Sequence, residues 1–161
     1  MYIVNADRQK QMLDRLIEVG AAENGWHTAY QLAESGQRFV RFFHHPESHG
    51  GGQPVLRTDP VPNSLAAWLH ECFESPDRDD VVGLAWELSR AFEMWPAVLD
   101  WLETRSSVIG SDAARLFLTQ LEILAPGNRR SILGKHLSEI DRDYAHFNAL
   151  ADRARRLLGD A

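Results

Sequence analysis

The sequence predicts a mostly helical α+β domain, on three observations. Apolar residues recur at helical spacing over most of residues 64–161. Two stretches rich in aromatic and β-branched residues precede them, on either side of a turn that contains Gly36. The 161 residues, of which 44% are hydrophobic and 25% charged, suit one globular domain. We therefore expect a helix and a small β-hairpin in residues 1–43, a Pro/Gly-rich loop in residues 44–63, and a multi-helix bundle in residues 64–161 that ends in one long helix.

The first 43 residues carry both kinds of pattern. The segment Asp7–Gly20 is expected to be a helix because its apolar residues share one helical face: Met12, Leu13, Leu16 and Ile17. Residues 26–32 and 38–43 are rich in β-forming residues and predict the two strands of a hairpin. Since two strands alone are marginally stable, the hairpin is expected to pack on helices or to recruit Tyr2-Ile3-Val4 as a third strand.

Residues 44–63 form the one long segment that the sequence predicts to be irregular. Four prolines and three consecutive glycines argue against regular structure over most of it. A loop of this length in a compact domain is usually functional or mobile.

The remaining residues predict successive helices. Ser64 and Ser111 are expected N-caps, and Ser75-Pro76 is expected to restart the chain as a new helix. The last helix has the clearest pattern, with alternating steps of four and three through Leu133, Leu137, Ile140, Tyr144, Phe147, Ala151, Ala154 and Leu158. One continuous helix from about Asn128 to Leu158 is therefore expected. Packing across its own domain is favoured over a coiled-coil seam between two copies.

Composition limits the classes of partner. The net charge of −6 argues against nucleic acid, because binding phosphate needs a cationic surface. No stretch approaches the ~20 apolar residues of a membrane span. The N-terminus has no secretory pattern, and Cys72 is a single cysteine, so a cytoplasmic protein is expected.

The acidic charge is concentrated in the middle of the chain, which suggests a surface for a basic protein partner. Residues 70–103 hold nine Asp or Glu against two Lys or Arg, whereas the flanking segments are near balance. Trp86 and Trp101 lie off the main apolar stripes of their helices, and exposed aromatic residues are enriched at protein interfaces. A merely solvated acidic face explains the charge equally well. The predicted partner-binding residues are Glu74, Asp77, Asp79, Asp80, Trp86, Glu87 and Trp101.

Catalytic and metal-binding patterns are weak. His44, His45 and His49 share the predicted loop and are candidate metal ligands, but their spacing matches no established pattern and gives the donors no fixed geometry. Cys72 lies on an apolar helical stripe, which is typical of an inert core thiol. We therefore expect no catalytic residue, no tightly bound metal and no cofactor.

One resemblance supports an inhibitor function. The segments Trp95–Leu102 and Ile109–Leu118 form a short helical pattern, a Gly-bearing link and a second pattern rich in Ala and Leu. This arrangement resembles small bacterial immunity-type proteins encoded beside secreted toxins, which implies a protein partner and no catalytic residues.

These observations together predict a non-enzymatic protein-binding module that neutralises a basic toxin or enzyme through an acidic surface. One alternative is a small enzyme or metal-dependent ligand-binding domain that uses the loop at residues 44–63. The other is a structural module that forms a homodimer through the C-terminal helix.

Overall fold

The computed structural model describes residues 1–21, 26–45, 52–105, 107–125 and 127–159. The chain forms two compact units, Met1–Leu84 and Ala85–Ala161, here called unit 1 and unit 2. The boundary between them falls within one helix, α3 (Arg78–Leu88). Among the described residues, no helix has both the length and the apolar composition needed to cross a membrane.

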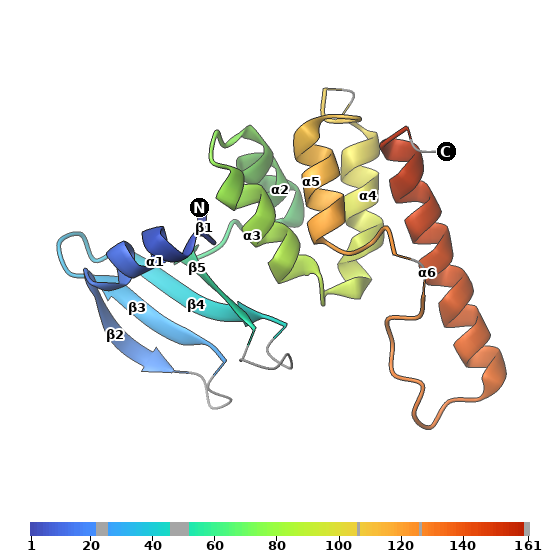
Figure 1. Cartoon of the computed structure of the whole chain (residues 1–161), viewed down its shortest axis with the longest axis horizontal. Helices are drawn as coiled ribbons and strands as arrows, with labels where there is room; N and C mark the ends of the chain where they lie inside the picture. The colour runs from blue at the N-terminus through green and yellow to red at the C-terminus, as the bar shows by residue number, and fades with distance from the viewer. Residues whose placement is uncertain (22–25, 46–51, 106, 126, 160–161) are drawn as a thin grey trace. The chain divides into compact units, whose positions relative to one another are not determined.

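Unit 1 is built on a five-stranded antiparallel sheet in the order β1-β5-β4-β3-β2 (Figure 1). The strands are β1 (Tyr2–Ile3), β2 (Leu16–Ala21), β3 (Thr28–Leu32), β4 (Arg38–His44) and β5 (Gln53–Asp59). The predicted helix-dominated bundle is therefore wrong, because a full sheet precedes most of the helices. The predicted hairpin is confirmed as β3 and β4, and Tyr2 and Ile3 do join the sheet, although they pair with β5.

The N-terminal helix is shorter than expected. Helix α1 (Ala6–Leu13) begins behind Asn5, whose side chain accepts a hydrogen bond from the Arg8 N–H, and the chain then turns into β2. The expected helix Asp7–Gly20 is thus wrong in its second half. The apolar residues of Leu16-Ile17-Glu18-Val19 fit a strand as well as one helical face, and pairing with β3 makes this segment a strand. Ile17 and Val19 are consequently exposed on an edge strand, at 58% and 52%.

The predicted irregular loop contains a strand whose centre is buried. Residues 46–51 lie outside the described residues, but Gln53–Asp59 is β5, and Val55 and Leu56 are fully buried. The expectation of an irregular segment over 44–63 is wrong there because Pro54 and Pro60 stand at the start and just past the end of the strand, where they remove few ladder hydrogen bonds.

One face of the sheet forms a core with α1. Ile3, Phe39 and Leu56 are buried together, and Met12, Leu16, Tyr30 and Leu32 pack against them. The buried Gln9 of α1 donates from Nε2 to the carbonyl oxygens of Ile3 and Pro54, each at 2.8 Å. This amide therefore fastens the helix to β1 and β5.

Helix α2 (Leu65–Glu74) completes unit 1 together with the first part of α3. The Ser64 hydroxyl accepts a hydrogen bond from the Ala67 N–H, so the predicted N-cap is confirmed. Ser75-Pro76 ends α2, and α3 starts only at Arg78.

The regular elements described in unit 2 are all helical. After the last residues of α3 come a short 3-10 turn, η1 (Phe92–Met94), and the helices α4 (Trp95–Glu103), α5 (Asp112–Gln120) and α6 (Leu137–Leu157). Its core includes Trp95, Leu99, Phe117 and Phe147, and the Phe147 ring lies edge-on to the Trp95 ring, with centroids 5.9 Å apart. The predicted Ser111 cap is confirmed.

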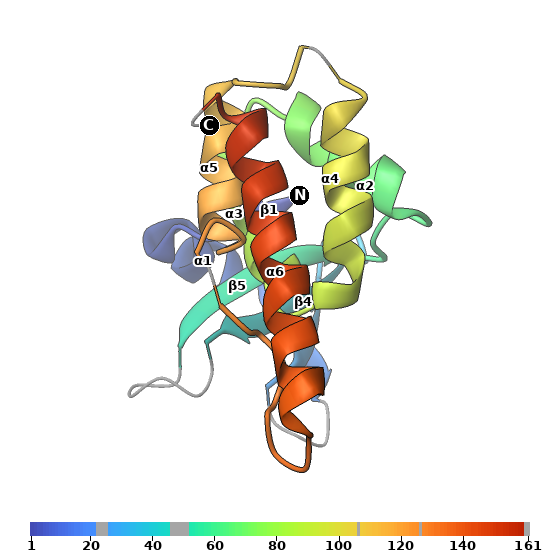
Figure 2. The ribbon, with the colours of Figure 1, turned by 90° about the vertical axis from the view of Figure 1, so that its right-hand side faces the viewer.

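The last helix starts later than the pattern predicts. Residues 128–136 are not helical, and Gly134 in this segment has a φ of +77°. Glu139 accepts a hydrogen bond from the His136 N–H at 2.9 Å, which fixes the start of α6 at Leu137. The expected continuous helix from Asn128 to Leu158 is therefore wrong over its first turns. Figures 1 and 2 both show the N-terminal half of α6 extending beyond α4 and α5.

Candidate functional site

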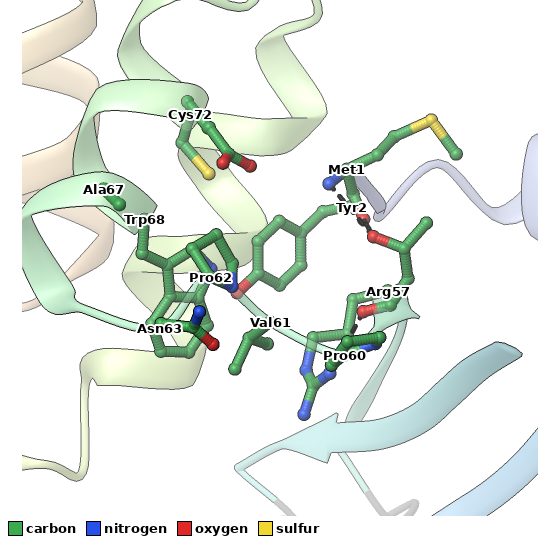
Figure 3. Close-up of a pocket in the computed structure, with 12 residues that line it drawn as sticks. Met1, Tyr2, Arg57, Pro60, Val61, Pro62, Asn63, Ala67, Trp68 and Cys72 are labelled. Atoms are coloured by element: carbon green, nitrogen blue, oxygen red, sulfur yellow. Dashed lines mark hydrogen bonds between the residues drawn. The ribbon is translucent and has the colours of Figure 1, made fainter.

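A cavity of about 450 Å³ lies in unit 1, beside β1, the end of β5 and α2 (Figure 3). Its lining combines aromatic and apolar side chains with polar groups, in about equal accessible shares. Those that define its chemistry are Tyr2, Arg57, Val61, Pro62, Trp68 and Glu71. A volume of this size is within the range of pockets that hold small ligands or single side chains of a partner.

Two aromatic residues form the apolar wall. Tyr2 reaches the cavity because it opposes Arg57 in the β1–β5 register, and Figure 3 shows its ring directed toward Trp68 and Pro62. Trp68 lies in the first turn of α2, where its backbone N–H donates to the Ser64 carbonyl at 3.0 Å. Both rings are thus positioned by regular backbone structure.

The position of Tyr2 is further fixed by α3. The Tyr2 N–H donates to the buried Asp80 carboxylate, and a Cβ added at Gly83 would lie 2.5 Å from atoms of the Tyr2 side chain. Only glycine at position 83 allows this close approach. The aromatic wall therefore exists before any ligand arrives.

The polar groups of the cavity differ in their surroundings. The Arg57 Nη1 donates to the Thr58 carbonyl at 3.1 Å and lies 3.4 Å from Asp59 Oδ1, so its charge is offset locally. Glu71 is exposed on α2, and Glu74 is exposed at the end of the same helix, which carries no Lys or Arg. Neither glutamate has an ion pair with another described residue. The helix beside the cavity therefore presents acidic charge.

Three of the predicted partner-binding acids have intramolecular roles. Asp80 is 5% exposed and accepts hydrogen bonds from the Tyr2 N–H and, at 2.5 Å, from the Ser75 hydroxyl. Asp79 accepts from the N–H groups of Val4 and Asn5, at 3.1 and 3.2 Å. These carboxylates therefore attach the N-terminal segment to the start of α3.

Asp77 completes this attachment through Arg8 of α1. The two Asp77 oxygens accept from Arg8 Nη1 and Nη2 at 3.1 and 2.5 Å, and Asp79 Oδ2 lies 3.1 Å from Nη1. The hydrogen bond from Arg8 is the main reason that the pKa of Asp77 lies below its ordinary value, and the pKa of Arg8 is raised in return. Most of the charge that the sequence assigns to a partner surface here is used within unit 1.

The other predicted partner-binding residues are divided between the two units. Glu74 is exposed in unit 1, whereas Glu87 is half-buried in unit 2. Trp86, half-buried in unit 2, donates from Nε1 to Gln120 Oε1 at 2.7 Å. Trp101 is only 8% exposed, with the Arg105 guanidinium 4.1 Å from its ring centroid, so the expectation that it lies off the apolar face is wrong.

Unit 2 has an exposed apolar surface around the start of α6. Leu133 and Leu137 are 88% and 73% exposed, Ile132 is 57% exposed and Tyr144 is 48% exposed. Three of these four belong to the heptad pattern of the sequence, whose second half is buried at Phe147, Ala151 and Ala154. We call this set the α6 apolar surface.

Two of the three candidate metal ligands lie at the end of β4. His44 is buried, and the His45 ring centroid lies 4.0 Å from that of His44. His49 lies outside the described residues. Cys72, on the buried side of α2, contributes to the wall of the cavity.

The sequence pointed to the elements of the cavity but not to the cavity itself. Trp68 falls at the helical spacing of core residues, so its position alone indicates packing rather than a site, and nothing in the sequence places Tyr2 opposite Arg57. The proline-flanked run Pro60-Val61-Pro62 after a β-rich stretch was the one available signal.

Comparison with protein-family models, with curated proteins and with solved structures finds no match for this chain.

Proposed function

We propose that this chain is a non-enzymatic protein-binding module in which the cavity of unit 1 receives a bulky apolar side chain from a partner segment that carries basic residues next to it. The observation behind the proposal is the pairing of a preformed aromatic cavity with the acidic helix α2. Such a combination matches the usual anatomy of a protein interface, in which a buried anchor is surrounded by a polar rim.

The cavity favours an anchor that is apolar and flat. The half-buried Trp68 ring supplies a rigid aromatic surface, with the buried Tyr2 ring supporting the wall, and Val61 and Pro62 supply aliphatic contact. Because the backbone contacts of Tyr2 hold the wall in place, little conformational entropy would be lost when an anchor enters. A Leu, Phe or Trp side chain of a partner has suitable size and chemistry.

The exposed charges of α2 favour basic residues beside that anchor. Glu71 lines the cavity and Glu74 follows on the same helix. Opposite charge at the rim speeds encounter and selects among partners, more than it adds to affinity. Because this chain carries a net charge of −6, a partner with a net positive charge is favoured as well.

The resemblance of residues 95–118 to immunity-type proteins suggests a class of partner. We propose a basic toxin or enzyme that the chain neutralises in the cytoplasm, where the single Cys72 thiol would stay reduced. The acidic composition and the anchor cavity support this proposal.

A library of random short peptides tests the binding mode without a known partner. We expect the selected peptides to share a bulky apolar residue with Lys or Arg nearby. Trp68→Ala should weaken their binding at least tenfold, as for an anchor contact. Trp26→Ala is the matched control, because Trp26 is exposed in unit 1 and does not line the cavity.

The charged rim has its own test. The double variant Glu71→Gln/Glu74→Gln should slow association at low salt, whereas Glu18→Gln/Glu34→Gln removes the same charge from other exposed sites and should have little effect. Peptides without a basic residue, or binding that survives Trp68→Ala, would contradict the proposal.

A second candidate function is self-association through the α6 apolar surface. Leu133 and Leu137 expose most of their surface, which is costly in water unless something covers it. Sedimentation equilibrium over a range of concentrations would detect a dimer. Leu133→Ser/Leu137→Ser should abolish it, and a monomer at all concentrations would exclude this candidate.

A further inference from the structure

The rings of His44 and His45 lie side by side although the two residues are adjacent in the chain. Successive side chains of a regular strand point to opposite faces of the sheet. His45, just past the end of β4, instead has a φ of +52°, in the left-handed region. This turn of the backbone brings the ring centroids to 4.0 Å, with an angle of 53° between the ring planes.

The backbone opposite the pair holds this arrangement. Gly52 has a φ of +77°, and a Cβ at this position would lie 2.2 Å from the His44 carbonyl oxygen and 2.6 Å from that of His45. His44 also pairs with Gln53 at the last position of the β4–β5 ladder. A non-glycine residue in the left-handed region persists only where its surroundings fix it, and such sites are often functional.

The two imidazoles have the chemistry of a metal site. Their ligand nitrogens lie within 4.8 Å of each other, so small side-chain rotations would allow both to bind one ion at the usual distance of about 2.0 Å. Imidazole nitrogen suits Zn²⁺, Ni²⁺ and Cu²⁺, and Cu²⁺ binds such donors most strongly. His44 is buried, which limits its alternative orientations.

We propose that His44 and His45 form a two-imidazole site for a divalent transition-metal ion. Cu²⁺ is the ion that should bind most tightly, and solvent or another donor fills the remaining coordination positions. The sequence predicts no tight site because residues in a loop lack fixed geometry. The structure gives two of the three candidate histidines a fixed geometry, and this site is independent of the proposed protein binding.

Copper titration of the full, untagged chain tests the proposal. Electron paramagnetic resonance of the parent protein with one equivalent of Cu²⁺ should show coupling to two equivalent imidazole nitrogens. Isothermal titration should give one equivalent bound. A spectrum of aqueous Cu²⁺, or of coordination by one nitrogen only, would overturn the proposal whatever the variants do.

The variants then assign the ligands. His45→Asn removes the donor while keeping a residue that tolerates the left-handed conformation, and His44→Phe keeps a buried aromatic ring. Each should lower the Cu²⁺ affinity at least tenfold. His70→Asn, at an exposed histidine of unit 1, is the control and should bind as the parent does. Unchanged affinity in His45→Asn would also overturn the proposal.

Discussion

Gly83 of α3 packs directly against the side chain of Tyr2, so close that a Cβ at position 83 would lie 2.5 Å from three atoms of Tyr2. Tyr2 is 1% exposed, and it is the residue that projects from β1 into the cavity. The shape of the cavity therefore depends on the absence of a side chain at position 83.

Gly83→Ala should destabilise the protein by about 1–3 kcal/mol, because the new methyl overpacks a closely packed site. Within an ordinary helix the same change stabilises by roughly 0.5–1 kcal/mol, so the sign of the effect is diagnostic. Gly20→Ala is the control, because a Cβ there meets nothing within 4 Å. Urea midpoints of the two variants measure the difference, and a more stable Gly83→Ala would refute the close contact.

Phe147→Ala and Leu137→Ala should differ sharply, although the sequence pattern predicts the same cost for both. Phe147 is 3% exposed and contacts Trp95 and Phe92, so its removal should cost about 3–5 kcal/mol. Leu137 is 73% exposed, so its removal should change stability by less than about 0.5 kcal/mol. Denaturant unfolding of both variants decides the matter. A large loss in Leu137→Ala, measured at several protein concentrations, would reveal that a partner copy covers this residue.

Asp80→Ala should cost about 1.5–3 kcal/mol, because two donors lose a buried charged acceptor. Glu74→Ala, at an exposed position nearby in the sequence, should stay within about 0.5 kcal/mol of the parent. Thermal and urea unfolding of the pair compares a structural acid with an acid that remains open to solvent. Equal effects would mean that the attachment of the N-terminal segment contributes nothing to stability.

The Arg8–Asp77 pair should make stability depend on acid pH. The hydrogen bond from Arg8 lowers the pKa of Asp77 in the folded protein, so the unfolded chain binds its proton first as pH falls. The contribution is complete above the ordinary aspartate pKa of about 3.9 and is lost as pH falls below it through the lowered value. Asp77→Asn should therefore flatten the decline of the urea midpoint between about pH 5 and pH 2. A variant with the parent's slope would place this acid sensitivity elsewhere.

The local signals in the sequence were good guides to caps and to the hairpin. Ser64 and Ser111 cap helices because their hydroxyls meet N–H groups three residues later, which is a local property. The helix predicted over Leu16 and Ile17 is wrong because their apolar spacing fits both a helix and a strand. Only the pairing with β3, a contact between separate segments, distinguishes the two.

The candidate sites depend on contacts that no local pattern encodes. The sequence pattern predicts a charged surface at Asp77, Asp79 and Asp80 because their partners, the backbone of residues 2–5 and Arg8, lie about seventy residues away in the chain. The His44–His45 pair depends on one backbone angle and on the approach of Gly52, neither of which is visible in the spacing of histidines.

The pairing of β1 with β5 has a consequence for biosynthesis. Strands β2 to β5 are neighbours both in the chain and in the sheet, so this meander can assemble progressively while a ribosome extends the chain. Tyr2 and Ile3 emerge earlier than these strands but cannot pair until Arg57 and Leu56 have followed. Their final anchors, Asp79 and Asp80, emerge later still. The segment that forms β1 must therefore remain unpaired through most of the synthesis of unit 1, and its docking completes the sheet and builds the cavity in the same late step.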